Sequence, residues 1–232
     1  MIILPSSGLG FISITKCAST TIEGTLKNHK GIIMGGTAGL KHMRYRHVEE
    51  FILPLLKIYR AQRPHFFAVV RHPAARMLSW YNFRTRDNIA HARPNSRRAS
   101  RYLGTMSLEE FVEQELDPSA KVDGPRVQTQ LNYLVDAKGN IGVDTLIKIE
   151  HLDAMLPDFM RHFNVRMEAV PPRLNTSPQA VTGGMSEDLI KKIVTSDRFG
   201  PDLDLYHKGV ESLPNGLPAR PKRKTKAGKN ND

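Results

Sequence analysis

Short apolar runs recur along the chain, and helical patterns follow most of them. Residues 10–14, 65–70 and 145–149 are runs of apolar, β-favouring residues, and residues 65–70 form the clearest of the three. An unbroken apolar run of this length is typical of a parallel strand that is covered on both faces. Residues 32–34 predict a further short strand, which ends at Gly35.

Apolar positions at helical spacing predict helices between these strands. In residues 45–59 the apolar side chains share one face, and Pro54 is expected to kink or interrupt the helix. Further helices are predicted over residues 20–26, 74–83, 127–134, 152–163 and 189–194, and another begins at Ser107.

Two helix starts carry the spacing of a capping box. Thr20 is followed by Glu23, and Ser107 by Glu110. Such a pair satisfies two backbone N–H groups at once, so each predicts where a helix begins. The repeated order of strand, loop and helix predicts an α/β fold with a central parallel sheet flanked by helices. In such sheets ligands bind at the carboxyl ends of the strands.

Composition divides the chain into a body and a tail. The 232 residues suffice for one domain, expected over residues 1–210, and residues 211–232 are expected to form a basic, disordered tail. The formal net charge of +11 indicates anionic partners. Part of this charge lies in the predicted loop 84–105, which contains Arg84, Arg86, Arg93, Arg97, Arg98 and Arg101.

The cysteine count and the hydropathy limit the remaining classes. Cys17 is the only cysteine, which excludes an internal disulfide framework and a multi-cysteine zinc site. No apolar run reaches the ~18 residues that a membrane helix needs, and the first residues do not resemble a secretory signal. A reducing cytoplasm is therefore the expected location. The basic tail would also suit peripheral contact with an acidic membrane surface.

The first motif lies where the strand at residues 10–14 meets the following helix. Lys16 precedes three successive hydroxyl residues, Ser19, Thr20 and Thr21. A helix N-terminus offers unpaired N–H groups and a positive dipole end, which favour a phosphate group. A capped helix with an exposed lysine explains this segment equally well when it is taken alone.

The second motif follows the strand at residues 65–70. Arg71 leaves the strand, Pro73 suits a first helical turn, and Arg76 and Ser79 follow at helical spacing. Arginine binds a dianionic phosphate well, because its planar fork can donate to two oxygens at once. Pairing of Arg71 with a carboxylate is the alternative interpretation.

Together the two motifs resemble the donor-binding signatures of sulfotransferases that use 3′-phosphoadenosine 5′-phosphosulfate (PAPS). The nearest group is sulfotransferase family 2, with the carbohydrate O-sulfotransferases and their bacterial relatives. Thr15 stands where that family usually has proline, and the second signature matches at Arg71, Pro73, Arg76, Ser79 and Tyr81. The resemblance also extends to Gln128 or Gln130 before Tyr133, and to residues 148–152.

This resemblance implies a fold, a donor and a set of site residues. The implied fold is a three-layer α/β fold like that of P-loop NTPases, and PAPS would bind without a metal. The 5′-phosphosulfate would lie on the first motif and the 3′-phosphate on the second, with a polar Asn-x-Ser segment nearby. The implied donor-binding residues are Lys16, Cys17, Ala18, Ser19, Thr20, Thr21, Arg71, Arg76, Ser79, Asn175 and Ser177.

An in-line transfer needs charge stabilisation and a base for the acceptor hydroxyl. Lys16 would neutralise charge on the leaving phosphate. His42 is the first candidate for the base, because the resembling family often has a Lys-His pair between the two signatures, and His47 is the second. The expected acceptor is a carbohydrate hydroxyl, and the arginine-rich loop suits an anionic glycan. A structural or solvent-facing role explains either histidine as well.

Two other classes remain open from the sequence. A nucleotide-dependent kinase with a P-loop would need a Ser or Thr after the loop lysine to hold magnesium, and Cys17 occupies that position. A basic nucleic-acid-binding module would suit the loop at residues 84–101 and the tail, although no specific nucleic-acid motif is present. The sequence does not define the oligomeric state.

Overall fold

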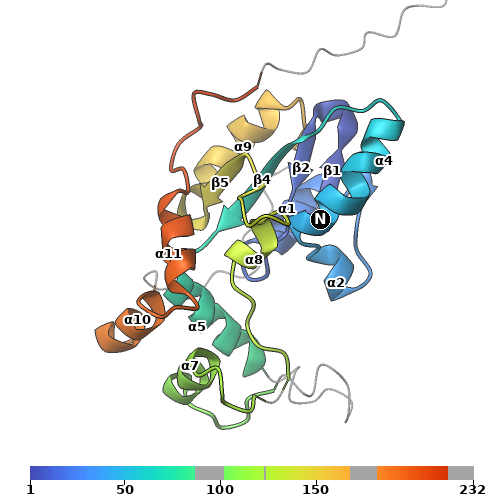
Figure 1. The fold of residues 1–232 in the computed structure, drawn as a ribbon. Helices are drawn as coiled ribbons and strands as arrows, with labels where there is room; N and C mark the ends of the chain where they lie inside the picture. The colour runs from blue at the N-terminus through green and yellow to red at the C-terminus, as the bar shows by residue number, and fades with distance from the viewer. Residues whose placement is uncertain (87–101, 123, 168–181, 219–232) are drawn as a thin grey trace, which may run out of the picture.

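The structure is a computed structural model that describes residues 1–86, 102–122, 124–167 and 182–218 (Figure 1). In these residues one five-stranded sheet has the order β3-β1-β2-β4-β5. Its central strands β2, β4 and β5 are parallel, whereas β1 pairs antiparallel with both β2 and β3. The strands are β1 (Ile2–Leu4), β2 (Leu9–Phe11), β3 (Ile32–Ile33), β4 (His65–Val70) and β5 (Thr145–Lys148).

The α/β fold with a central parallel sheet flanked by helices is therefore confirmed. Strand β4 covers the predicted range 65–70, and β5 covers all but one residue of the range 145–149. Strand β1 was not predicted, because a three-residue run that ends at Pro5 carries too little pattern. Strand β2 ends earlier than predicted. Ile12 still donates its N–H to the Phe67 carbonyl at 3.0 Å, and the backbone then leaves the sheet.

Helices follow the strands and cover the sheet (Figure 1). A short 3-10 turn (Pro5–Ser7) links β1 to β2, and another (Ile149–His151) links β5 to its helix. The α-helices are α1 (Ser19–Leu26), α2 (Ala38–Lys41), α3 (Tyr45–His47), α4 (Leu53–Ile58), α5 (Pro73–Arg84), α7 (Leu108–Leu116), α8 (Leu131–Leu134), α9 (Leu152–His162), α10 (Glu187–Val194) and α11 (Gly200–His207).

Pro54 disturbs its helix without ending it. A π-helical segment, Val48–Ile52, joins α3 to α4, so that the helix runs on through the position of the proline. Proline lacks an N–H, and its ring would clash with the carbonyl four residues earlier in a regular α-helix. The wider π turn immediately before Pro54 relieves this conflict.

Only one of the two predicted capping boxes is present. Ser107 and Glu110 exchange side-chain and backbone hydrogen bonds at 2.7 and 3.1 Å, as predicted. The prediction for Thr20 was wrong, because α1 already begins at Ser19 and has no side-chain cap. Glu23 instead forms an ion pair with Lys41, with Nζ and Oε2 2.7 Å apart.

Two hydrophobic cores support the cavity described below. The larger one lies on both sides of the sheet and includes Phe67, Phe159 and Phe163. The smaller one joins α5, α7 and α10, which Figure 1 shows grouped at the end of the sheet where β4 leads into α5. Residues 211–218, at the start of the predicted tail, lie in the described part, and His162 Nε2 donates to the Pro218 carbonyl at 2.7 Å. The tail from residue 219 on, and residues 87–101 of the basic loop, lie outside the described residues.

Candidate active site

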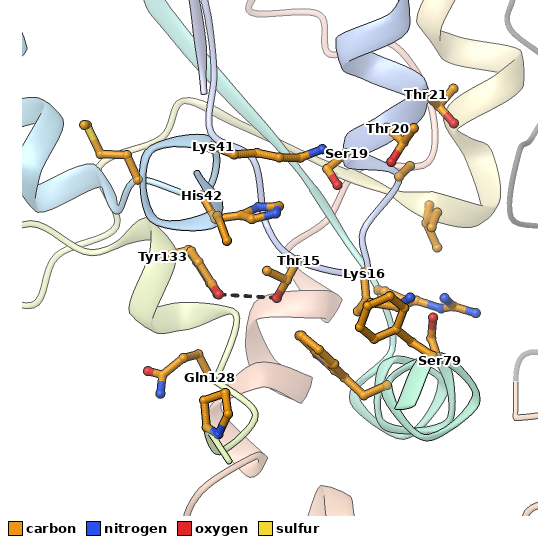
Figure 2. A pocket seen from close by; sticks show the side chains of 18 of the residues that line it. Thr15, Lys16, Ser19, Thr20, Thr21, Lys41, His42, Ser79, Gln128 and Tyr133 are labelled. Atoms are coloured by element: carbon orange, nitrogen blue, oxygen red, sulfur yellow. Dashed lines mark hydrogen bonds between the residues drawn. The ribbon is translucent and has the colours of Figure 1, made fainter. Parts of the chain in front are cut away.

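A cavity of about 1250 Å³ opens beside the carboxyl ends of β2 and β4 (Figure 2). The loop between β2 and α1 forms one wall, and helix α5, which follows β4, forms another. Helix α2, the segment before α8 and residues 149–150 and 152–153, around the start of α9, also line it. Nine of the residues selected from the sequence line this cavity: Lys16, Ala18, Ser19, Thr20, Thr21, His42, His47, Arg71 and Ser79.

The loop before α1 has an unusual backbone. Lys16 and Ala18 both have left-handed conformations, with φ of 67° and 53°. Such a conformation costs an L-residue about 1–2 kcal/mol, so the surrounding contacts must hold it in place. The first N–H bonded within the helix is that of Ile22, which donates to the Ala18 carbonyl at 3.1 Å. The N–H groups of the first turn therefore remain available at the positive end of α1.

Lys16 lies in a positively charged environment. Its pKa is lowered from 10.5 to about 8, mainly by burial and also by the nearby charges of Arg86 and Arg71. Its Nζ lies 4.6 Å from the centre of the Phe83 ring. The positive charges of Lys16, Arg71 and Arg86 repel one another. An anion bound between them would remove this repulsion, so their proximity favours the binding of an anion. The geometry thus favours a strongly anionic ligand beside Lys16.

Arg71 and Ser79 provide the other polar wall. Arg71 is the first residue after β4, and Ser79 lies two turns along α5. The backbone of Arg71 is held on both sides by Gln130, whose Oε1 accepts the Arg71 N–H at 2.9 Å and whose Nε2 donates to the Arg71 carbonyl at 2.7 Å. The starting point of the Arg71 side chain is therefore well defined.

Two of the residues selected for donor binding do not line the cavity. Arg76 is 1 % exposed, and it donates from Nε to the Thr15 carbonyl at 3.0 Å and from Nη2 to Thr15 Oγ1 at 2.9 Å. Cys17 is buried as well, and burial raises the pKa of its thiol to about 11. The side chains of both residues therefore lie on the side of the loop that faces away from the cavity. The spacing of the sequence motifs alone did not predict this orientation. The other two selected residues, Asn175 and Ser177, lie outside the described residues.

His42 is oriented by a backbone contact. Its Nδ1 donates to the Ser13 carbonyl at 2.8 Å, which leaves the lone pair of the neutral ring on Nε2. Burial lowers its pKa below the usual 6.5, so the ring is neutral near pH 7. His47 also lines the cavity, but its Nε2 accepts a hydrogen bond from Arg46 Nε at 3.3 Å. His42 is thus the better placed of the two to accept a proton.

The cavity also includes residues that the sequence did not mark as site residues. Tyr133 Oη lies 3.3 Å from Thr15 Oγ1, the contact drawn in Figure 2. Arg44 Nη2 donates to Gln128 Oε1 at 3.3 Å, and Trp80 adds an aromatic wall. Arg44 lies only two residues after His42, and this proximity was the only local feature that could have indicated it as a site residue. Trp80 directly follows Ser79 in α5, whereas Gln128 and Tyr133 come from a distant segment.

No site for a metal ion is found in the described part of the chain, where no three His, Cys, Asp or Glu residues are grouped suitably. Among residues 1–86, 102–122, 124–167 and 182–218, none of the helices combines the length and the apolar character needed to cross a bilayer.

One comparison with known proteins found a match. The family model described as "Sulfotransferase family" matches residues 1–131, which is more than half of the chain and includes both sequence motifs. No curated protein and no solved structure matches. The chain belongs to the sulfotransferase family, and it is therefore a sulfuryl-transferring enzyme. This assignment favours neither the kinase nor the nucleic-acid-binding alternative.

Proposed function

We propose that this enzyme transfers a sulfuryl group from PAPS to a carbohydrate hydroxyl, with His42 as the general base. One observation carries the choice of donor: two groups of anion-binding residues, which follow two adjacent parallel strands, open into the same cavity. One group is centred on Lys16 and the other on Arg71 and Ser79. A nucleotide with phosphates at both its 5′ and 3′ positions has an anionic group for each.

The loop 15–21 would hold the 5′ side of the donor. Bound PAPS supplies an activated sulfuryl group whose transfer leaves a phosphate behind. Lys16 is suited to neutralise charge on that phosphate, and the first-turn N–H groups of α1 are suited to donate to it. The hydroxyls of Ser19, Thr20 and Thr21, which all line the cavity, can add hydrogen bonds. Positioning and charge stabilisation are the main demands of an in-line transfer.

The proton of the acceptor hydroxyl would move to His42 Nε2. The contact between Nδ1 and the Ser13 carbonyl fixes the ring orientation and the tautomer that a base requires. The lowered pKa keeps that nitrogen unprotonated at neutral pH. His47 remains the second candidate, although Arg46 Nε already donates to its Nε2.

A carbohydrate suits the part of the cavity beyond the donor loops. Trp80 and Phe83 offer aromatic faces, and Arg44 offers hydrogen-bond donors for hydroxyl or carboxylate groups. The volume exceeds the ~300–1,000 Å³ typical of a pocket for one small ligand. A cavity of this size can hold a donor and an acceptor together. The cytoplasmic location and contact of the tail with a membrane stay predictions from the sequence.

Calorimetry tests the donor directly. We expect 3′-phosphoadenosine 5′-phosphate, the donor without its sulfuryl group, to bind more tightly than 5′-AMP, and to do so without a metal. Tighter, magnesium-dependent binding of ATP would contradict the proposal. The acceptor is tested by transfer of radiolabelled sulfate from PAPS to a panel of neutral and acidic glycans. Transfer only to a non-carbohydrate hydroxyl would exclude a carbohydrate acceptor.

A further inference from the structure

We propose that Gln130 is a spacer that sets the distance between the two phosphate-binding loops. This inference rests on the donor proposed above. Gln130 is 0 % exposed and lies behind the cavity. Its Oε1 accepts the N–H of Arg71 at 2.9 Å and the S–H of Cys17 at 3.3 Å, and its Nε2 donates to the Arg71 carbonyl at 2.7 Å. One amide group thus contacts the loop after β2 and the end of β4.

A second set of contacts holds Gln130 itself. The Asp202 carboxylate of α11 is 0 % exposed and accepts the N–H of Gln130 at 2.8 Å and that of Leu131 at 2.9 Å. Asp202 Oδ2 also lies 3.9 Å from Nη1 of Arg76, the residue that donates to the Thr15 carbonyl. The contacts therefore close a ring that runs from the first loop through Arg76, Asp202 and Gln130 back to that loop.

The position of this ring indicates how it acts. Neither Gln130 nor Asp202 lines the cavity, so neither contacts the nucleotide there. Both are positioning residues that act through the loops. A ligand with one phosphate contacts a single loop and can move with it when that loop shifts. A ligand with two phosphates must contact both loops at once, so it binds well only when their distance is correct. A fixed spacing therefore matters most for the bisphosphate.

An uncharged amide suits this position better than a carboxylate. A primary amide offers both a donor and an acceptor, which the Arg71 carbonyl and N–H require. It also adds no negative charge beside Lys16 and Arg71. A buried carboxylate would accept both hydrogen bonds from the loops, but it would lack the donor and would compete with the phosphates for these cations.

The first test replaces the amide and compares two ligands. In Gln130→Met, a change of similar volume, we expect 3′-phosphoadenosine 5′-phosphate to bind about 30-fold more weakly, as for the loss of two net hydrogen bonds. Binding of 5′-AMP should weaken by less than about 3-fold, because this ligand does not span the loops. Titration calorimetry gives both dissociation constants. Phe163→Leu, which alters buried packing beside His65 at the other end of β4, should leave their ratio unchanged.

A milder pair of variants tests the link to the first loop. Cys17→Ala removes the thiol and with it the S–H donor, and it should lower the preference for the bisphosphate by about 3-fold, since a thiol is a weak donor. Cys17→Ser keeps a donor and should restore most of the preference. If Gln130→Met does not fold, these two Cys17 variants test whether Gln130 acts as a spacer.

The outcomes separate the spacer from the proposed function. If the unchanged protein prefers the bisphosphate, but Gln130→Met weakens both ligands by the same factor, then Gln130 only supports the fold and the spacer is refuted. Equal ratios in Cys17→Ala and Cys17→Ser would refute it as well. If the unchanged protein shows no preference for the bisphosphate, the proposed donor is wrong and the spacer falls with it.

Discussion

Raising the pH from about 7 to about 9 should weaken binding of the 3′,5′-bisphosphate through Lys16. The pKa of Lys16 in the free protein is about 8, so roughly 90 % of this lysine is charged at pH 7 and roughly 10 % at pH 9. A bound phosphate favours the charged form and raises this pKa. The complex then holds more protons than the free protein, and the affinity must fall as the pH rises.

The expected size follows from these fractions. If the pKa of Lys16 in the complex returns to its ordinary range above about 10, the dissociation constant should rise about 10-fold between pH 7 and pH 9. Calorimetry in buffers of different ionisation enthalpy measures this change and the uptake of about half a proton at pH 8. The pKa of His42 lies below this range and that of Cys17, at about 11, lies above it. Neither group titrates strongly in the window.

A substitution of the lysine provides the control. Arginine stays charged throughout this range, so Lys16→Arg should show an almost flat dependence of affinity on pH. A flat profile for the unchanged protein would show that Lys16 does not titrate as its surroundings imply. The same slope in Lys16→Arg would assign the effect to another group. Either result would refute the role given to the lysine.

Three further predictions concern the base, a buried ion pair and the strained loop. His42→Ala should lower turnover about 100-fold with little change in donor affinity, whereas His47→Ala should retain most of the activity; full activity of His42→Ala in steady-state assays would exclude it as the base. Glu115 is 0 % exposed, and its Oε2 lies 3.0 Å from Arg198 Nη1. Glu115→Gln should therefore lower the free energy of unfolding, measured in urea, by about 3 kcal/mol. Glu109→Gln, a change at an exposed position of the same helix, should have little effect. Ala18→Gly should raise that free energy by about 1 kcal/mol, because glycine adopts the left-handed conformation without strain; a lower thermal midpoint would contradict this account.

The sequence by itself determined the two motifs that line the cavity and the strands that lead to them. Strand β4 and the residues after it are defined by a local pattern, in which an unbroken apolar run ends at Arg71 and a helix begins at Pro73. Lys16 was recognisable from the same kind of local pattern together with the family resemblance, although β2 ends earlier than the apolar run predicted. Both motifs line the cavity.

Only the tertiary structure decided which side chains of these motifs face the cavity. Arg76 and Cys17 belong to the motifs by spacing, yet both are buried behind the loop. Their partners, Gln130 and Asp202, come from segments more than 50 residues further along the chain, and no local pattern connects them. Strand β1 likewise depends on pairing with β2 and β3 and not on its own three residues. Local patterns record which backbone a segment prefers, but the direction of a buried polar side chain depends on where the rest of the fold places its hydrogen-bond partner.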